Sequence, residues 1–385
     1  MKTVTILGAT GSVGSSTLDL VEREPDRFRV LALTAHRDVT KLAEAALRTN
    51  ARRAVVADDS CLEALRSALA GTGIEAAAGA AALLEAAAMG ADWTMAAIVG
   101  CTGLEPVMAA VGQGGIVVLA NKEPLVSAGE VVLAAAARHG ATLLPADSEH
   151  NAIFQCFDPK QLKRVRRIIL TASGGPFRDW STERMRDVTP EQAVAHPNWS
   201  MGAKISIDSA TMMNKGLELI EAARLFPVAH DQIEIILHRQ SVIHSMVEYV
   251  DGSTLAQLGP PDMRVPIAHC LAWPDRMQTP MAPLDLVAIG RLDFQAPDPV
   301  RFPALALARL ALDAGGARPA ILNAANEIAV AAFLGRAIGF LEIAAIVADT
   351  LDRYDPPAPK TLEDVLAVDA EARRLADERV KDCVA

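Results

Sequence analysis

Cysteine pairs, aromatic side chains and long apolar runs are all scarce in this chain of 385 residues. Its five cysteines are odd in number, scattered and never in Cys-x-x-Cys spacing, which argues against a disulfide framework or a zinc knuckle. No uncharged apolar run approaches the ~20 residues that span a bilayer, so no membrane segment is expected. The opening MKTVTILGATGSVG begins a strand almost at once and leaves no room for a signal peptide. A cytoplasmic protein with reduced thiols is therefore expected.

Positive charge is also in deficit. The formal net charge of −10 would repel phosphates and argues against a nucleic-acid partner. The one basic run, KRVRR at 163–167, is short and typical of a solvated face. What the chain does have is hydrophobic residues, at 51%, which indicates a large core rich in Ala, Val, Leu and Ile. A chain of this length is expected to form two or three domains.

Short apolar runs alternate with helical patterns through the first 146 residues. Helices are predicted at 14–24 and 40–50, the Ala-rich stretch 75–89 reads as a helix with a glycine break, and strands are predicted at 4–9, 28–35, 53–58, 93–100, 116–121 and 142–147. This alternation predicts an α/β fold with a Rossmann-like parallel sheet covered on both faces. Ligands of such sheets bind at the carboxyl ends of the strands.

The pattern changes from about residue 148. Strands at 167–173 and 233–249 predict a mixed sheet, and 209–226 predicts one helix whose N-cap is Asp208 or Ser209. After a Pro-rich stretch, helices fill the rest, including 317–334 and a charged final helix from about 368; no internal repeat is present. We therefore predict four parts: a Rossmann-like nucleotide domain at 1–147, an α+β domain at 148–272, a linker at 273–298 and a C-terminal α-helical domain at 299–385.

A glycine motif lies between the first strand and the first helix. Gly8, Gly11 and Gly14 form G-x-x-G-x-x-G, a variant of the dinucleotide fingerprint. Glycine lets the backbone approach a pyrophosphate, and the helix N-terminus supplies free N–H groups and partial positive charge. Strand, turn and helix follow in the right order, which favours nucleotide binding over a merely tight turn.

Two further strand ends border this expected cofactor site. The second strand ends at His36, Arg37 and Asp38, where an NAD enzyme usually has an acidic residue. Arg37 could face a 2′-phosphate, which favours NADP(H). Asp38 is not a natural neighbour for a phosphate, and Arg37 as a solvated loop residue remains an alternative. Another strand end carries Asn121, Lys122 and Glu123, which are expected to border the nicotinamide.

A pair of carboxylates ends the last strand of the first domain. Asp147 and Glu149 are i, i+2, and on an extended chain both face the same side. Two close carboxylates repel one another unless they share a proton, a basic partner or a divalent metal. With only oxygen ligands on offer, Mg²⁺ or Mn²⁺ is favoured over zinc. An acid/base dyad and a solvated loop remain alternatives.

The predicted helix 209–226 offers a third carboxylate and a set of phosphate ligands. Asn214 and Glu218 are i, i+4 on one face, and Lys215 is i, i+3 from Glu218, although such a stripe is also typical of a surface salt bridge. Ser209 begins the helix, where an anion is favoured, and Ser173 precedes two glycines at a strand end. These residues together would make a phosphate site beside a metal.

A loop with an unusual composition separates these segments. His196, Trp199 and Met201 punctuate AHPNWSMGAK, and an exposed tryptophan wastes apolar area. A flap that closes over a substrate fits this pattern. The alternative is a loop pinned to its domain by a buried Trp199.

These motifs resemble the 1-deoxy-D-xylulose 5-phosphate reductoisomerase family. The matching stretches run in family order from residue 6 to about 334 and include ILGATGSVGSSTLDL, LANKEPLVSAG, LLPADSEHNAIFQC, LTASGGPF, HPNWSMGAKISIDSATMMNKGLELIEA, HRQSVIHSMVEYVDGSTLAQLGPPDMRVPIAHC and LNAANEIAVAAFL. The sequence departs from many members at AHRD, 35–38, where they carry a glycine and an asparagine. The departure leaves the recognition of the adenosine phosphate open.

The resemblance implies a homodimeric, NADPH-dependent oxidoreductase and isomerase of non-mevalonate isoprenoid biosynthesis. Retro-aldol and aldol steps, then hydride transfer, would convert 1-deoxy-D-xylulose 5-phosphate to 2-C-methyl-D-erythritol 4-phosphate. Asp147, Glu149 and Glu218 would hold Mg²⁺ or Mn²⁺, with Co²⁺ a further candidate, and Lys122 would lie near the reacting groups. By position, the substrate residues would be Ser148, Ser173, His196, Trp199, Met201, Ser209, Asn214, Lys215 and Met263. The NADPH residues would be Thr10, Gly11, Ser12, Val13, Arg37, Asn121, Glu123 and Gly202, beside Gly8, Gly14, His36, Asp38 and Lys122 of the motifs above.

Two rival functions remain at this point. A metal-free NADP-dependent reductase would use the acids as a proton relay and would resist chelators. A non-catalytic nucleotide-sensing protein on the same scaffold would tolerate replacement of the acids.

Overall fold

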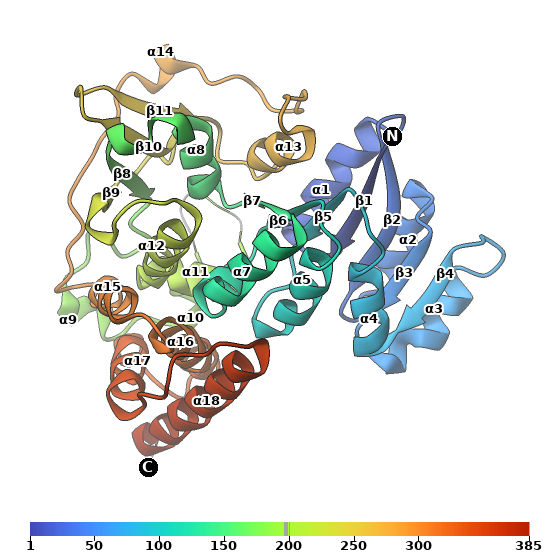
Figure 1. Ribbon diagram of the computed structural model, residues 1–385. Helices are drawn as coiled ribbons and strands as arrows, with labels where there is room; N and C mark the ends of the chain where they lie inside the picture. The colour runs from blue at the N-terminus through green and yellow to red at the C-terminus, as the bar shows by residue number, and fades with distance from the viewer. Residues whose placement is uncertain (196–198, 200, 385) are drawn as a thin grey trace. The chain divides into compact units, whose positions relative to one another are not determined.

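The computed structural model describes residues 1–195, 199 and 201–384 (Figure 1). Its chain divides into two compact units. Unit 1 comprises Met1–Pro124, Val131–Asn151 and Met263–Met281, and unit 2 comprises Leu125–Glu130, Ala152–Asp262 and the chain from Ala282 onward. The four-part division expected from the sequence stays a prediction.

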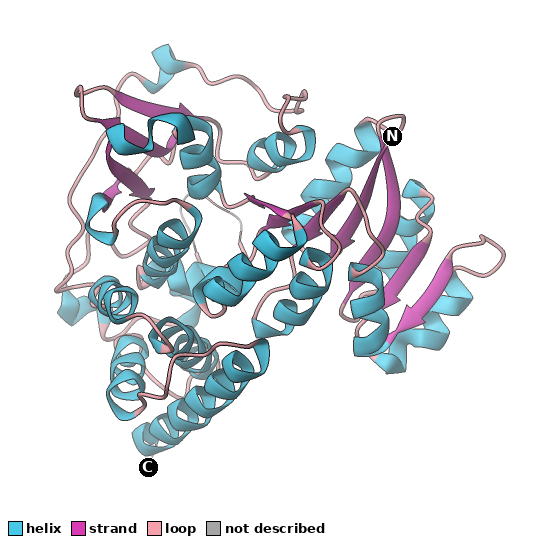
Figure 2. Ribbon diagram, viewed as in Figure 1, coloured by secondary structure: helices cyan, strands magenta, loops and turns pink. Residues whose placement is uncertain are grey.

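Unit 1 is built on the predicted Rossmann-like parallel sheet. Within the described residues its seven strands lie in the order β4-β3-β2-β1-β5-β6-β7, all pairs parallel (Figure 2). The strands are β1 Lys2–Leu7, β2 Phe28–Ala35, β3 Arg53–Val56, β4 Glu75–Ala78, β5 Trp93–Ala96, β6 Ile116–Leu119 and β7 Thr142–Pro145. Their apolar side chains are largely buried, as expected of a parallel sheet covered on both faces.

The helices of unit 1 follow the strands in alternation. They are α1 Ser12–Arg23, α2 Val39–Thr49, α3 Leu62–Ala68, α4 Gly79–Ala87, α5 Leu104–Val111 and α13 Arg264–Ala272, while α6 Glu123–Val126, α7 Gly129–His139 and α8 Ser148–Cys156 contain the boundaries between the units. The prediction of one broken helix over 75–89 is wrong in its first half. The alanines of β4 pair with β3, and this pairing overrides their helix propensity until Gly79, at φ +88°, turns the chain into α4.

Unit 2 contains the predicted mixed sheet. Among the described residues its four strands lie in the order β11-β10-β8-β9, with β8 parallel to β9 and β10 antiparallel to both β8 and β11. They are β8 Val165–Ala172, β9 Ile233–Leu237, β10 Ile243–Tyr249 and β11 Thr254–Leu258. The single strand predicted over 233–249 is two strands, because the chain turns between them at Ser241, φ 51°. No strand was predicted from the sequence at the position of β11.

Helices make up most of the rest of unit 2. They are α9 Thr182–Met185, α10 Pro190–Val194, α11 Ala203–Ala210, α12 Met213–Leu225, α14 Leu286–Ile289, α15 Ala304–Ala314, α16 Arg318–Leu334, α17 Glu342–Arg353 and α18 Leu362–Val384. The C-terminal region is therefore helical, as predicted, and α16 packs against both α17 and α18. No helix in the described part of the chain is long and apolar enough to cross a membrane.

The single helix predicted over 209–226 is in fact two helices. α11 ends at Ala210, and α12 begins after Met212, whose φ of 65° lies in the left-handed region. The Thr211 hydroxyl donates to the carbonyl of Ile207 and accepts from the N–H of Met213 at 3.3 Å, so side-chain hydrogen bonds replace part of the helical ladder. The predicted N-cap is wrong, because Asp208 and Ser209 lie inside α11.

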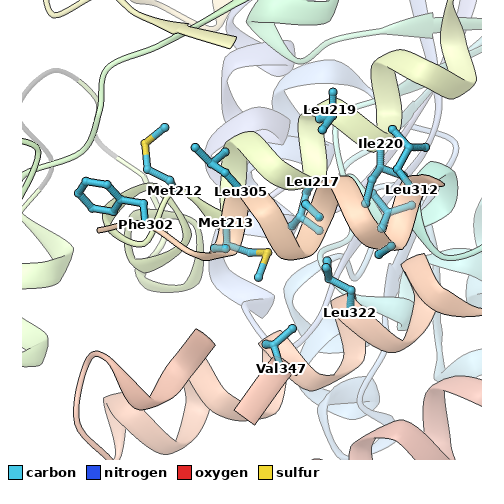
Figure 3. Packing of buried hydrophobic residues seen from close by; sticks show 14 of the residues in the cluster. Met212, Met213, Leu217, Leu219, Ile220, Phe302, Leu305, Leu312, Leu322 and Val347 are labelled. Atoms are coloured by element: carbon cyan, nitrogen blue, oxygen red, sulfur yellow. The ribbon is translucent and has the colours of Figure 1, made fainter. Parts of the chain in front are cut away.

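The core of unit 2 surrounds α12. Figure 3 shows Leu217 and Ile220 of α12 gathered with Leu305 and Leu312 of α15 and Leu322 of α16. A Cβ at Gly216 would lie 2.6 Å from the Cβ of Ala308, so glycine is what permits this close helix packing. The core therefore fixes α12, the helix that carries the predicted polar stripe.

Candidate active site

The glycine turn of unit 1 is packed too tightly for any side chain at two of its three glycines. A Cβ at Gly14 would lie 2.2 Å from the Gly8 carbonyl oxygen, and one at Gly8 would lie 2.6 Å from that of Ala97. Gly11 is the extended N-cap of α1, exposed and without a side-chain cap. The first turn of α1 therefore presents N–H groups past a residue with no side chain, which fits a pyrophosphate. The other predicted residues of this turn are Thr10, Ser12 and Val13, and none of them is fully buried.

The two charged residues after β2, Arg37 and Asp38, have different partners. Arg37 is exposed and its Nε pairs with Asp58 at 2.5 Å. Asp38 caps α2 by accepting from the N–H of Lys41 at 3.1 Å, and its carboxylate pairs with the Lys41 ammonium at 3.2 Å. The backbone hydrogen bond from Lys41 holds the pKa of Asp38 below its usual value. Asp38 thus has a structural task, which explains an acid beside a proposed phosphate-binding arginine; His36 next to it is exposed.

The end of β6 holds a buried amide. Asn121 is 7% exposed, and neither its Oδ1 nor its Nδ2 has a hydrogen-bond partner among the described residues. Its Nδ2 lies near Gly103, where an added Cβ would be 3.0 Å away. A buried unpaired amide is costly, so Asn121 fits a ligand with both a donor and an acceptor, such as a carboxamide. Glu123 begins α6 and is buried.

The end of β7 differs from the geometry expected. α8 begins at Ser148, so Glu149 lies in a helical first turn and the extended i, i+2 relationship with Asp147 is wrong. A helix N-terminus stabilises carboxylates, which is the physical reason for acids here. Asp147 is ion-paired with Lys122 from the end of β6, and the Ser148 hydroxyl donates to Glu149. The solvated loop proposed as an alternative is also wrong, because Asp147 and Lys122 are only 15% and 13% exposed.

The phosphate candidates of unit 2 come together at one turn. Ser173, Gly174 and Gly175 follow β8, and both glycines have positive φ. A Cβ at Gly175 would lie 2.6 Å from the carbonyl oxygen of Ser209, so the turn lies directly against the end of α11. The Ser173 hydroxyl accepts from the Gly175 N–H at 3.2 Å.

The polar stripe of α12 is buried. Glu218 is 1% exposed and accepts hydrogen bonds from both the Asn214 amide and the Lys215 ammonium, the latter itself buried. A surface salt bridge, the alternative drawn from the sequence, is therefore wrong. A buried ion pair is weak support for stability, so the buried Lys215–Glu218 pair, with the half-buried Asn214 amide beside it, points to a ligand.

The structure describes only part of the predicted flap. Trp199 lies with its ring centroid 6.1 Å from that of His244, while Met201 is half-buried and Gly202 is the N-cap of α11. His196 lies outside the described residues. In unit 1, Met263 is half-buried and precedes α13.

Comparison with known proteins assigns these features to one family. Family models match at residues 4–129 (1-deoxy-D-xylulose 5-phosphate reductoisomerase), 143–226 (its C-terminal domain) and 258–375 (DXP reductoisomerase C-terminal domain). A 1-deoxy-D-xylulose 5-phosphate reductoisomerase of Zymomonas mobilis is 65% identical over 97% of this chain and 96% of its own, and one of Rhodospirillum centenum is 60% identical over 99% and 94%. The chain belongs to the 1-deoxy-D-xylulose 5-phosphate reductoisomerase family.

Solved structures agree with this reductoisomerase family. The Zymomonas mobilis enzyme in complex with NADPH has a TM-score of 0.94 at 62% identity, covering 98% of this chain and 99% of its own. A reductoisomerase in complex with NADPH, fosmidomycin and magnesium has a TM-score of 0.93 at 44% identity, covering 99% and 98%. The resemblance inferred from the motifs and the predicted fold class are thereby confirmed.

Asn151, which was not predicted as a site residue, holds the segment after β7 in place. Asn151 is buried, and its Nδ2 lies 2.9 Å from the Pro145 carbonyl oxygen, 3.2 Å from His269 Nδ1 and 3.3 Å from Cys270 Sγ. It therefore fastens the first turn of α8 to the end of β7 and to α13. Burial lowers the pKa of His269 to about 4 and raises the pKa of the Cys270 thiol. The available signals were Pro145, two residues before Asp147, and an asparagine two residues after Glu149.

Proposed function

We propose that this chain catalyses the NADPH- and divalent-cation-dependent conversion of 1-deoxy-D-xylulose 5-phosphate to 2-C-methyl-D-erythritol 4-phosphate, in the non-mevalonate route to isoprenoid precursors. Membership of the reductoisomerase family over nearly the whole chain carries this proposal. The reaction joins a skeletal rearrangement, by retro-aldol and aldol steps, to a hydride transfer. The enzyme is thus both an isomerase and an NADP-dependent oxidoreductase that acts on a small phosphosugar.

The residues of unit 1 fit NADPH. We propose that the turn of Thr10, Gly11, Ser12 and Val13, held by Gly8 and Gly14, binds the pyrophosphate. Arg37, beside His36 and Asp38, binds the 2′-phosphate; its side chain is exposed and pairs with the half-buried Asp58. Asn121, with its unpaired amide, binds the carboxamide of the nicotinamide, flanked by Glu123 and Lys122. Gly202 is assigned to the cofactor from family resemblance alone.

We propose Asp147, Glu149 and Glu218 as the protein ligands of one Mg²⁺ or Mn²⁺ ion, or of Co²⁺. All three are oxygen donors, which hard divalent cations prefer. Asp147 and Glu218 each have a lysine partner, Lys122 and Lys215, so positive charge already stabilises their ionised forms. A bound cation supplies Lewis acidity at the ketone and hydroxyl oxygens, and bound NADPH supplies the hydride.

The remaining residues bind and orient the substrate. Ser173, Ser209, Asn214 and Lys215 hold the phosphate, since two hydroxyls, an amide and an ammonium offer the donors that a phosphate needs. Ser148 donates to a substrate hydroxyl, and Lys122 places a positive charge beside the oxygens on which negative charge develops. His196, Trp199 and Met201 cover the substrate and Met263 borders it, which excludes water and retains fragments during rearrangement.

The parts of the chain would then divide the work. We propose that 1–147 binds NADPH and that 148–272 is the catalytic and connective domain with the metal, the substrate phosphate site and the flap. We further propose that 273–298 is a linker and that 299–385 is a C-terminal helical domain. A homodimer is proposed from the family resemblance. A cytoplasmic location is proposed from the five cysteines, none of which is in a disulfide.

The test is the loss of NADPH absorbance on adding 1-deoxy-D-xylulose 5-phosphate, with Mg²⁺ or Mn²⁺ and then with excess chelator. The proposal expects oxidation that needs both the phosphosugar and the cation, and a branched product on mass and NMR analysis. Oxidation that survives chelation would instead indicate a metal-free reductase. Folded protein that binds NADPH but never oxidises it with this substrate would contradict the substrate assignment.

A further inference from the structure

A buried carboxylate lies directly beside the proposed phosphate residue Ser209. Asp208, in α11, is 1% exposed. Its two oxygens have different partners: Oδ2 pairs with the Lys204 ammonium one turn earlier at 2.9 Å, and Oδ1 accepts from Asn326 Nδ2 at 2.7 Å. A buried carboxylate is destabilising unless each oxygen has a partner, so Lys204 and Asn326 both stabilise the buried Asp208.

The partner on the other side belongs to the C-terminal helices. Asn326 is fully buried in α16, 118 residues further along the chain. One turn before it, the Asn323 amide donates to Glu327 at 3.0 Å, and Glu327 pairs at 2.6 Å with Arg373 of α18. α16 is therefore itself held by polar contacts to the last helix. The hydrogen bond from Asn326 ties α11 to this bundle.

The segment after Asp208 is the one that carries the phosphate ligands. Ser209 lies against Gly175 of the turn that contains Ser173, with no space even for a methyl group. Met212 then takes a left-handed conformation before α12 presents Asn214 and Lys215. Left-handed backbone at a non-glycine residue is strained and persists only when its surroundings fix it. A shift of α11 would therefore move both halves of the phosphate site.

We propose that Asp208 and Asn326 are positioning residues for the substrate phosphate, through which the C-terminal helices set the place of Ser209 and the start of α12. The inference rests on the proposed function. It assigns the C-terminal bundle a part in substrate binding, although neither residue touches the substrate.

The test is a charge-exchange cycle on the full-length enzyme. Asn326→Asp sets two carboxylates against each other, and the double variant Asp208→Asn/Asn326→Asp restores one donor and one acceptor. Asn326→Leu removes the donor without adding charge and serves if Asn326→Asp does not fold. Thr350→Val is the matched control, because Thr350 is a buried polar residue of the same bundle whose hydroxyl donates to the Ile346 carbonyl inside α17, away from α11.

We expect Asn326→Asp and Asn326→Leu to raise KM for the phosphosugar by about tenfold or more, the loss of roughly one charged hydrogen bond. The dissociation constant for NADPH should stay within about twofold, and the double variant should recover most of the KM. Unchanged KM in folded variants, an equal rise in Thr350→Val, or no recovery in the folded double variant would overturn the inference. A wild-type enzyme with no turnover would instead contradict the proposed function.

Discussion

Lys122 and Asp147 form an ion pair at the ends of two neighbouring parallel strands, β6 and β7. Parallel strands deliver the residues that follow them to the same sheet edge, which is why side chains 25 positions apart meet. Both are largely withdrawn from solvent, so the attraction between them is weakly screened. A cation that binds Asp147 must share this carboxylate with Lys122 or displace the ammonium group.

This relationship predicts the effect of removing the lysine. Lys122→Met should lower kcat by about 100-fold or more, because the positive charge beside the developing oxyanion is lost. Mn²⁺ affinity should stay the same or rise, since a competing cation has gone. Steady-state NADPH oxidation and Mn²⁺ titration followed by electron paramagnetic resonance give the two quantities. A lower Mn²⁺ affinity, with turnover restored by excess Mn²⁺, would show instead that Lys122 only shapes the cation site.

Glu218 provides the second prediction. Glu218→Gln keeps the size of the side chain but removes the charge that the cation requires, so turnover should fall by at least about 100-fold and Mn²⁺ affinity with it. NADPH affinity should change little, because all the proposed cofactor residues except Gly202 lie in the other unit of the chain.

Glu248→Gln is the matched control for this variant. Glu248 is also a buried carboxylate of unit 2, but it pairs with Arg166 and Arg167 at the sheet. Its replacement should lower stability and leave Mn²⁺ affinity as in the wild type. Normal turnover in Glu218→Gln, or equal losses of Mn²⁺ affinity in the two variants, would remove Glu218 from the proposed ligand set.

The sequence predicted those parts of the fold that follow from local pattern. Continuous apolar strands between helices predict a parallel sheet because both of its faces must be buried, and the six strands predicted for it are all present. The glycine turn was recognisable because its residues are adjacent in sequence and each is needed for a close approach. The remaining site residues were predicted from the motifs that the sequence shares with the family.

What the sequence did not disclose depends on partners distant in the chain. The alanines of β4 form a strand only because β3 is beside them, and the break at Met212 depends on the hydroxyl of Thr211 and on the packing of two helices. The local sequence predicts that Asp208 is a helix cap. Its hydrogen bond from Asn326, 118 residues away, is visible only in the folded structure. The role of Asn151 likewise depends on its hydrogen bonds to His269 and Cys270 of α13.

Arg37 should decide the preference between the two nicotinamide cofactors. Arg37→Gln removes a charged hydrogen-bond donor from the proposed 2′-phosphate site, so NADPH affinity should fall by roughly 10- to 100-fold while NADH affinity is unchanged. Fluorescence titration with each cofactor measures both. Lys41→Gln, which removes a neighbouring cation that pairs with Asp38, should have a small effect. Equal losses for NADPH and NADH in Arg37→Gln would mean that the arginine does not recognise the 2′-phosphate.

Two glycines of the turn, Gly14 and Gly11, should respond differently to the same added methyl group. Gly14→Ala brings a Cβ within 2.2 Å of a backbone oxygen, so it should lower the melting temperature of the protein and abolish NADPH binding with it. At Gly11 the nearest atom would be 3.4 Å away, so Gly11→Ala should fold normally. Its methyl group would still obstruct the pyrophosphate, and NADPH affinity should fall by about tenfold or more. Normal NADPH affinity in folded Gly11→Ala would place the pyrophosphate elsewhere.

His269 predicts a dependence of stability on pH. Burial, with a smaller repulsion from Arg276, lowers its pKa from 6.5 to about 4, so the unfolded chain takes up a proton between these values while the folded chain does not. The free energy of unfolding should therefore decrease as pH falls through this window, by about 1 kcal/mol between pH 7 and pH 5 from this residue, since solvent screens part of the effect on a half-buried ring. His269→Gln, which cannot titrate, should lose that much less stability over the same interval, as measured by urea denaturation of the full-length protein at each pH. His139→Gln, at an exposed histidine, should behave as the wild type does. The same pH dependence in His269→Gln and the wild type would mean that the half-buried imidazole is protonated in the folded protein, and that Asn151 faces a charged partner there.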